Sequence, residues 1–313
     1  SLPGVKSVTP LVIHFPASST SVPFLGIPQQ VWQAHGNAGE GIRIGIIDSG
    51  IDYQHAAFGG SGTEADYKAN DRTKAPDAFF PNARVVGGYD FAGDEYGEGA
   101  VPKPDPDPMD CGGHGSHVAG IAAGSGVRAD GTTYPGPYDG TIPFSSLRIG
   151  PGVAPKASLY ALRVFGCSGG TGLVTQALEW AVDPNRDWDF SDGLDVVNLS
   201  LGSVYGGAFD SAAKAADVAA KAGVVVVCAA GNAGDTHFVT GSPGTSDYSL
   251  SVAASVDSGV TASLLRVLQP ASLAGRLEAA TASFGGTPPL RHNTTFGFQS
   301  RSGCACWMPG NGR

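Results

Sequence analysis

The chain has 313 residues, of which 47 are Gly and 22 are Pro, and 15% are charged beside 42% that are apolar. Disordered chains combine few apolar residues with high charge, so this composition predicts a folded, loop-rich protein. The formal charge of −9 argues against nucleic acid and against an anionic membrane surface as partners. The longest apolar run, residues 224–230, is far shorter than the about 18 residues of a spanning helix.

Four short apolar runs predict buried strands, at residues 42–47, 158–165, 194–199 and 224–230. Between the later runs, Ala-rich and Leu-rich patterns predict helices over 172–182 and 209–222. This alternation predicts an α/β fold in which helices cover both faces of a parallel sheet. Ligands of such sheets bind at the carboxyl ends of the strands. Polar and glycine-rich residues follow the predicted strands at Asp48, 167–170, 200–202 and 231–232.

The region 59–113 is dense in Asp, Gly and Pro, and prolines alternate with other residues over 102–108. Alternate prolines block both helices and sheet ladders, so we expect an extended surface loop here. The carboxylates offer ligands for calcium, but they show no regular ligand spacing, which favours a solvated acidic loop. The segment 287–313 contains no acidic residue and differs in composition from the rest of the chain.

The five cysteines show no pair with the spacing of a structural zinc site, and their odd number leaves at least one without an intrachain partner. Cys228 lies within an apolar run and is expected to be a buried small hydrophobic residue. Cys111 and Cys167 both lie in glycine-rich loops beside polar candidate residues. We predict a disulfide between these two in an oxidising compartment.

Two hypotheses compete for His114 and His117, which lie three residues apart at the start of a predicted helix. As metal ligands they lack an acidic third ligand at a familiar spacing and a Glu between them. As catalytic groups, His114 is a general base whose imidazole is held by a carboxylate at a strand end, for which Asp48 is the candidate. Taken alone, Asp48 before Ser-Gly is an ordinary turn residue. His117 and His55 are expected to be structural.

Five motifs in order along the chain connect these residues to a known family. They are Asp-Ser-Gly-Ile-Asp at 48–52, His-Gly-Ser-His-Val-Ala-Gly at 114–120, Gly-Val-Ala-Pro at 152–155, Asn-Leu-Ser-Leu-Gly at 198–202 and Ala-Ala-Gly-Asn at 229–232. Together they resemble the subtilisin-like serine proteases (subtilases). The segment 240–246 further resembles the branch of minor extracellular proteases that carries a protease-associated insertion.

The resemblance implies a role for each matching residue. Asp48 would fix the tautomer of His114, His114 would act as base and acid, and Asn232 would donate a hydrogen bond to the oxyanion. Two segments would flank an extended peptide and pair with its backbone, which requires small residues. These segments are Ser168, Gly169 and Gly170 on one side and Ser200, Leu201 and Gly202 on the other. Leu201, Ala230 and Gly231 would line the side-chain pocket.

The nucleophile is where the sequence departs from the family. Such proteases place their serine in a Gly-Thr-Ser-Met-Ala-type segment downstream of the Asn, and no such segment follows Asn232. Ser246 follows Gly-Thr but precedes Asp-Tyr, so we do not expect it to be the nucleophile. The sequence therefore predicts a C-terminally incomplete subtilisin-like fold. Its expected parts are the tail of an inhibitory propeptide at 1–12, an incomplete peptidase domain at 22–260, the start of an inserted domain at 261–286 and an atypical tail at 287–313.

The expected function is that of a secreted serine-type endopeptidase, here a fragment without its nucleophile and therefore inactive alone. Its expected partners are protein or peptide substrates and its own propeptide, with no nucleic acid and no membrane. No cofactor is expected for the reaction, and a structural calcium ion with unassigned ligands stays open. The alternative is a non-catalytic peptide-binding pseudoprotease. A dinucleotide-binding domain is disfavoured because no Gly-x-Gly-x-x-Gly follows the first strand.

Overall fold

The computed structural model describes residues 10–12, 18–97, 99–234, 237–255, 263–267 and 275–279. The chain divides into two compact units, of which the larger is Pro16–Ser258. The smaller unit combines Ser1–Phe15 with Gly259–Arg313. The larger unit contains every residue that the sequence assigns to a site.

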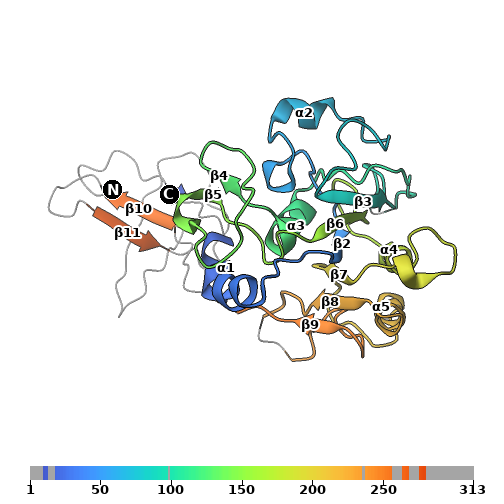
Figure 1. The fold of residues 1–313 in the computed structure, drawn as a ribbon. Coiled ribbons are helices and arrows are strands. Elements are labelled where there is room, and N and C mark those ends of the chain that lie inside the picture. Colours follow the sequence, from blue (N-terminus) through green and yellow to red (C-terminus); the bar gives the residue numbers. More distant parts are fainter. Residues whose placement is uncertain are drawn as a thin grey trace, which may run out of the picture. The chain divides into compact units, whose positions relative to one another are not determined.

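The centre of the larger unit is a sheet of six parallel strands in the order β3–β6–β2–β7–β8–β9 (Figure 1). In chain order the strands are β2 (Arg43–Asp48), β3 (Val85–Asp90), β6 (Ser158–Arg163), β7 (Val196–Leu199), β8 (Val225–Ala229) and β9 (Leu250–Val252). Four of them confirm the strands predicted from apolar runs. The parallel pairing confirms the predicted sheet type.

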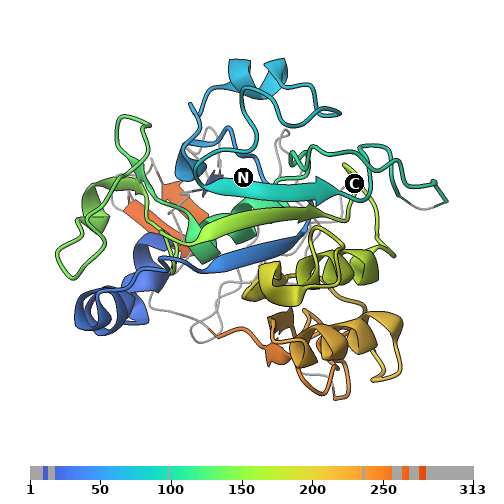
Figure 2. The same ribbon diagram turned by 45° about the vertical axis from the view of Figure 1, so that its right-hand side comes forward.

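Helices cover both faces of this sheet, as the alternating pattern predicted. Helix α3 (His114–Ala123) contacts β2 and β6, whereas α4 (Val174–Val182) contacts β2 from the other side and packs on α5 (Ser211–Lys221). Figure 2 shows α4 and α5 on one face of the sheet and α3 behind the strands. The sheet is thus the middle layer of three, which confirms the α/β fold class.

The alternation of side chains along β2 decides where its last residue points. Ile44 and Ile46 belong to the buried cluster that includes Ala119 of α3, whereas Ile47 belongs to the cluster that includes Leu178 of α4. Side chains two residues apart lie on the same face of a strand. Asp48 therefore lies on the face of Ile44 and Ile46, toward the helix that begins with His114.

The expectation of a solvated surface loop over 59–113 is wrong for much of the region. It contains α2 (Glu64–Ala69) and β3, and three of its carboxylates are almost fully buried, those of Asp90, Asp107 and Asp110. The buried carboxylates are tolerated because internal groups pair with them, through hydrogen bonds or, at Asp90 Oδ2, through an ion pair with Arg163. The Tyr53 hydroxyl, for example, lies 2.7 and 2.9 Å from the two carboxylate oxygens of Asp107.

Strand β3 escaped prediction because two glycines interrupt its apolar pattern. Gly88 has φ +149° and packs so closely on β6 that a Cβ there would overlap the backbone of Ala161. Gly87 packs in the same way against the ring of Tyr160. A sequence-based search weights side chains, whereas this strand is specified by close backbone contact.

The remaining elements of the larger unit are short and lie outside the main sheet. They are α1 (Ser18–Phe24), a π-helical turn (Pro28–Gln33), 3₁₀ turns (Ala56–Phe58, Phe144–Ser146, Phe190–Asp192) and the antiparallel pair β4 (Val127–Arg128) and β5 (Leu147–Ile149). None of the helices in the described ranges is long and apolar enough to cross a membrane.

The smaller unit contains an antiparallel sheet in the order β1–β10–β11. Its strands are β1 (Pro10–Val12), β10 (Ser263–Val267) and β11 (Gly275–Ala279). The interpretation of 1–12 as a propeptide tail and of 261–286 as an insertion stays a prediction. The atypical tail 287–313, with Cys304 and Cys306, lies outside the described residues.

Two of the cysteine predictions are confirmed. Cys111 and Cys167 form a disulfide with a Cα–Cα distance of 5.2 Å. Cys228 is a free thiol on β8, and it is only 1% exposed. Burial raises the pKa of this thiol to about 11, so it stays protonated at neutral pH.

Candidate active site

Asp48 and His114 form a hydrogen-bonded pair at the carboxyl end of β2. The Nδ1 atom of His114 lies 2.8 Å from Oδ1 and 3.0 Å from Oδ2 of Asp48. The Asp48 side chain is 1% exposed, whereas the His114 side chain is 59% exposed. One partner is therefore fixed inside the protein, and the other presents its second ring nitrogen to solvent.

Burial raises the pKa of Asp48, while the hydrogen bond from His114 and the amide of Ser49 oppose the rise. The Ser49 amide donates to Oδ1 over 2.7 Å. A carboxylate held by two donors accepts the Nδ1 proton of the imidazole, which leaves Nε2 as the basic nitrogen. The geometry therefore suits a neutral histidine that accepts protons from outside.

Close backbone packing brings the two side chains together. Helix α3 begins at His114, and Gly113 before it has a left-handed φ of +83°. A Cβ on Gly115 would overlap the carbonyl oxygen of Gly50. The helix start and the turn after β2 can therefore approach only because position 115 is glycine.

Asp110, which sequence reasoning did not single out, holds both sides of this arrangement. Its carboxylate is 3% exposed and accepts five hydrogen bonds, from Ser49 Oγ, from the amides of Gly112 and Gly113, and from the amide and hydroxyl of Ser116. The available sequence signal is an Asp two residues before Gly-Gly, because an Asp side chain at this spacing accepts from the amides of the turn that follows it. Asp110 therefore links the residues next to Asp48 with those next to His114.

The predicted peptide-binding segments follow neighbouring strands. Ser168, Gly169 and Gly170 come after β6, and Ser200, Leu201 and Gly202 come after β7, on either side of β2. None of these six residues makes a backbone–backbone hydrogen bond to another residue of the described ranges. Their amide and carbonyl groups are therefore available to an extended chain.

The predicted oxyanion donor follows β8 at the same edge of the sheet. Asn232 is exposed and comes after Ala230 and Gly231, of which Gly231 has φ +110°. Among the described residues its side chain has no hydrogen-bond partner, and no contact joins it to His114. Asn232 thus lies beyond the carboxyl end of β8, and its role as an oxyanion donor stays a prediction.

No hydroxyl in the described part of the chain donates to Nε2 of His114, since its hydrogen bonds there involve Asp48 alone. The hydroxyl of Ser246 instead donates to Asp217 Oδ1 over 2.5 Å. His55 caps the turn Ala56–Phe58 by accepting from the Ala57 amide, which is a structural role. His114 and His117 meet no third potential metal ligand within the described residues.

Comparison with known proteins gives matches over most of the chain. The profile described as "Subtilase family" matches residues 39–298. The minor extracellular protease Vpr of Bacillus subtilis (strain 168) is 34% identical over 241 residues, which are 76% of this chain and 23% of that protein. Subtilisin-like protease SBT2.6 of Arabidopsis thaliana is 34% identical over 263 residues, which are 74% of this chain and 29% of that protein.

Subtilisin DY of Bacillus licheniformis is 33% identical over 207 residues, which are 65% of this chain and 52% of that protein. The chain therefore spans about a quarter to a half of the length of these relatives.

Proposed function

Because the chain belongs to the subtilase family, we propose that it is the part of a serine endopeptidase that carries the general base of peptide-bond hydrolysis. The observation that carries this proposal is the 2.8 Å contact between Asp48 Oδ1 and His114 Nδ1. A buried carboxylate that orients an exposed imidazole is the arrangement that proton transfer to and from a serine requires.

The proposed reaction proceeds through an acyl-enzyme. A serine oxygen attacks the peptide carbonyl while its proton moves to His114 Nε2, and the same proton then passes to the leaving amine. Asp48 stabilises the imidazolium, and the side-chain amide of Asn232 donates to the oxyanion. Water then attacks the carbonyl of the acyl-enzyme, its proton moves to His114 Nε2, and that proton passes to the serine oxygen as the acid product leaves. Side chains carry each proton, so we propose no cofactor for the reaction.

We propose that the serine comes from a segment outside residues 1–313, since no Gly-Thr-Ser-Met-Ala-type segment follows Asn232 and no hydroxyl of the described residues donates to His114. The substrates would be proteins, bound as extended chains between residues 168–170 and residues 200–202. Leu201, Ala230 and Gly231 would line the pocket for the side chain before the scissile bond. The protein would be secreted, with residues 1–12 belonging to an inhibitory propeptide.

Because no hydroxyl of the described residues donates to His114, a second function is also favoured. A pseudoprotease that retains the peptide-binding segments but has no nucleophile would bind extended peptides without cleaving them. Both functions predict that residues 1–313 alone bind peptides and do not react with a serine-directed fluorophosphonate. Labelling of a serine within this chain would contradict the proposed origin of the nucleophile.

A chimera separates the two functions. In it, residues 1–255 continue into the part of Vpr that follows the segment matched here. The endopeptidase proposal expects casein hydrolysis that is lost in the His114→Ala chimera, with peptide binding retained as proof of folding. A chimera that binds peptides but leaves casein intact would contradict the endopeptidase proposal and favour the pseudoprotease.

A further inference from the structure

The disulfide Cys111–Cys167 lies beside the proposed active site but takes no part in its chemistry. Cys111 is three residues before His114, and Cys167 directly precedes Ser168. The Cys167 side of the bond is exposed, whereas Cys111 is half-buried. A nucleophile from solvent therefore reaches Cys167 more easily than Cys111.

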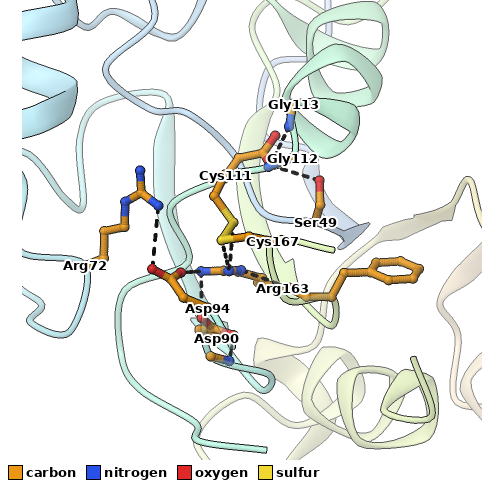
Figure 3. The surroundings of a disulfide bond; sticks show 12 residues. Ser49, Arg72, Asp90, Asp94, Cys111, Gly112, Gly113, Arg163 and Cys167 are labelled. Atoms are coloured by element: carbon orange, nitrogen blue, oxygen red, sulfur yellow. Dashed lines mark hydrogen bonds and ion pairs between the residues drawn. A yellow bond between two sulfur atoms is a disulfide. The ribbon is translucent and has the colours of Figure 1, made fainter. Parts of the chain in front are cut away.

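A buried arginine, Arg163, contacts both sulfurs of the disulfide (Figure 3). Arg163 at the end of β6 is fully buried, and its Nε donates to the carbonyl of Phe165 over 3.0 Å. Its Nη1 donates to Asp94 Oδ1 over 2.8 Å and lies 2.9 Å from Asp90 Oδ2. The second amino group, Nη2, faces the two sulfurs, at 3.1 Å from Cys111 Sγ and 3.7 Å from Cys167 Sγ.

Nη2 has no oxygen acceptor among the described residues, so its N–H groups depend on sulfur alone. A disulfide sulfur is a weak acceptor, and a buried donor with a weak acceptor is costly. A thiolate at Cys111 carries a full negative charge and would form a charge-assisted hydrogen bond with the same group. The guanidinium is therefore better satisfied when the disulfide is open.

The other charges around the sulfurs do not cancel this attraction. The Asp94 carboxylate lies within 4.8 Å of both sulfurs, but it forms ion pairs with Arg163 at 2.8 Å and with Arg72 at 3.6 Å. Asp90, the second anion beside Arg163, lies on the Nη1 side of the guanidinium, and burial raises its pKa. The carboxylate of Asp110, next to Cys111 in sequence, is already occupied by five donors.

We propose that Cys111–Cys167 is a thiol–disulfide exchange site that takes low-molecular-weight thiols. The thiolate of such a thiol attacks Cys167 Sγ, the bond between the two protein sulfurs breaks, and its electron pair leaves on Cys111 Sγ as a thiolate beside Arg163. The product is a mixed disulfide at Cys167. A second thiolate then attacks the small-molecule sulfur of this mixed disulfide. It releases the oxidised thiol dimer, and Cys167 leaves as a thiolate that takes a proton from water. The two small thiols supply the two electrons.

The leaving group determines the direction of the attack. A thiol with a lower pKa leaves faster in exchange, and a neighbouring cation lowers a thiol pKa. Both the exposure of Cys167 and the 3.1 Å contact of Cys111 with Arg163 favour the same product. The exchange requires neither the nucleophilic serine nor peptide binding, so it stands apart from the proposed function.

The first test measures the two thiols separately, in a background that carries Cys304→Ser and Cys306→Ser. Cys167→Ser leaves Cys111 as a free thiol, and Cys111→Ser leaves Cys167. Ultraviolet titration of the thiolates is expected to give Cys111 a pKa at least about one unit below the usual value of about 8.5, and below that of Cys167. Cys228, whose pKa is about 11, is the internal control. A Cys111 pKa at or above the usual value would overturn the proposal.

The second test treats the disulfide-intact protein in the same background with glutathione, then alkylates and maps the peptides by mass. Glutathione is expected on Cys167, with Cys111 alkylated. Glutathione on Cys111, or shared equally between the two, would overturn the proposed direction of attack.

The third test compares two arginines. Arg163→Gln is expected to lower the equilibrium constant for reduction by glutathione at least tenfold, whereas Arg72→Gln, which loses a contact to Asp94 but none to sulfur, is the matched control. Equal effects in the two variants would overturn the role of Arg163. The thiol titrations decide the proposal even if Arg163→Gln does not fold, because they leave Arg163 intact.

Discussion

Two buried carboxylates lie at the carboxyl ends of β2 and β3, the strands on either side of β6, and their partner side chains differ in exposure. Asp48 of β2 and Asp90 of β3 are both backbone neighbours of Arg163 on β6. Asp48 pairs with His114, which is 59% exposed, whereas Asp90 pairs with Arg163, which is fully buried. Both carboxylates are themselves nearly inaccessible to solvent.

The difference separates a pair that can exchange protons from a pair that cannot. An imidazole changes charge near neutral pH, and its exposed nitrogen meets solvent or substrate. A guanidinium stays charged at any ordinary pH, so it can only attract and orient. The Asp48–His114 pair therefore suits catalysis, and the Asp90–Arg163 pair suits structure and the stabilisation of a neighbouring anion.

The largest effect is expected when the Asp48–His114 pair is changed. In the active chimera, Asp48→Asn is expected to lower kcat by about ten-thousandfold, because an amide that donates to Nδ1 leaves the proton on Nε2 and removes the base. The measurement is casein or peptide hydrolysis with thermal unfolding as the control. The Tm is expected to change little, since the variant keeps the shape of the side chain and loses a buried charge. A loss of less than tenfold would mean that Asp48 does not set the tautomer.

The next largest effect is expected when the Asp90–Arg163 pair is changed. Arg163→Met is expected to lower the free energy of unfolding by about 3–5 kcal/mol, because it leaves the buried carboxylate of Asp90 without its cation. Urea unfolding of residues 1–313 measures the loss. His114→Ala is the matched control, and a smaller loss is expected, because the exposed histidine buries little surface and Asp48 keeps the hydrogen bond from the Ser49 amide. Similar losses in the two variants would contradict the distinction drawn between the pairs.

The double variant Arg163→Met with Asp90→Asn sharpens this prediction. Removing the carboxyl charge as well is expected to recover part of the lost stability, since no unpaired charge then remains near that position. Additive losses would show that packing of the arginine, and not its charge, stabilises this region.

The disulfide Cys111–Cys167 is expected to make the next largest contribution to the free energy of unfolding. It closes a loop of 56 residues, for which loop-closure entropy gives about 4 kcal/mol as an upper value. We expect a smaller loss on reduction, because a Cys111 thiolate gains a stronger hydrogen bond from Arg163. Urea unfolding of the oxidised and reduced forms at pH 8 tests this. At pH 5, where the thiol is protonated, the loss on reduction is expected to be larger, and an equal loss at both pH values would contradict the role of the thiolate.

The sequence allowed the prediction of four of the six sheet strands, because buried parallel strands are continuous apolar runs. It did not reveal β3, which close glycine packing specifies, or the burial of Asp90, Asp107 and Asp110. A carboxylate in a Gly-rich and Pro-rich region looks solvated in sequence. Whether internal donors surround it depends on contacts between segments that lie far apart in the chain.

The candidate site divides in a similar way. Asp48 and His114 were identified from motifs, and the structure brings them together. The five donors to Asp110 and the contact of Arg163 with the sulfurs come from different segments that meet only in the fold. Single motifs carry information on residues that touch substrate, but little on the residues that hold them in place.

The smallest effect concerns Asp105, whose backbone pairs with that of Asp90. Burial, with the charge of Asp90 among the further causes, raises the pKa of Asp105 to about 6. An acid whose pKa is higher in the folded than in the unfolded state binds its proton more tightly when folded. Stability from this group is therefore present at pH 4 and is lost as the pH rises through about 6. Since the group is partly exposed, screening reduces the loss to about 1 kcal/mol.

Urea unfolding between pH 4 and pH 7 measures this loss. Asp105→Asn is expected to flatten the dependence by that amount, whereas Asp71→Asn is expected to change it little above pH 5, because the pKa of Asp71 is about 2 when folded and about 3.9 when unfolded. An unchanged slope in Asp105→Asn would assign the titration to the buried carboxylates instead. Asp90→Asn would then be the variant that flattens the dependence of stability on pH, and the Asp90–Arg163 pair itself would be sensitive to pH.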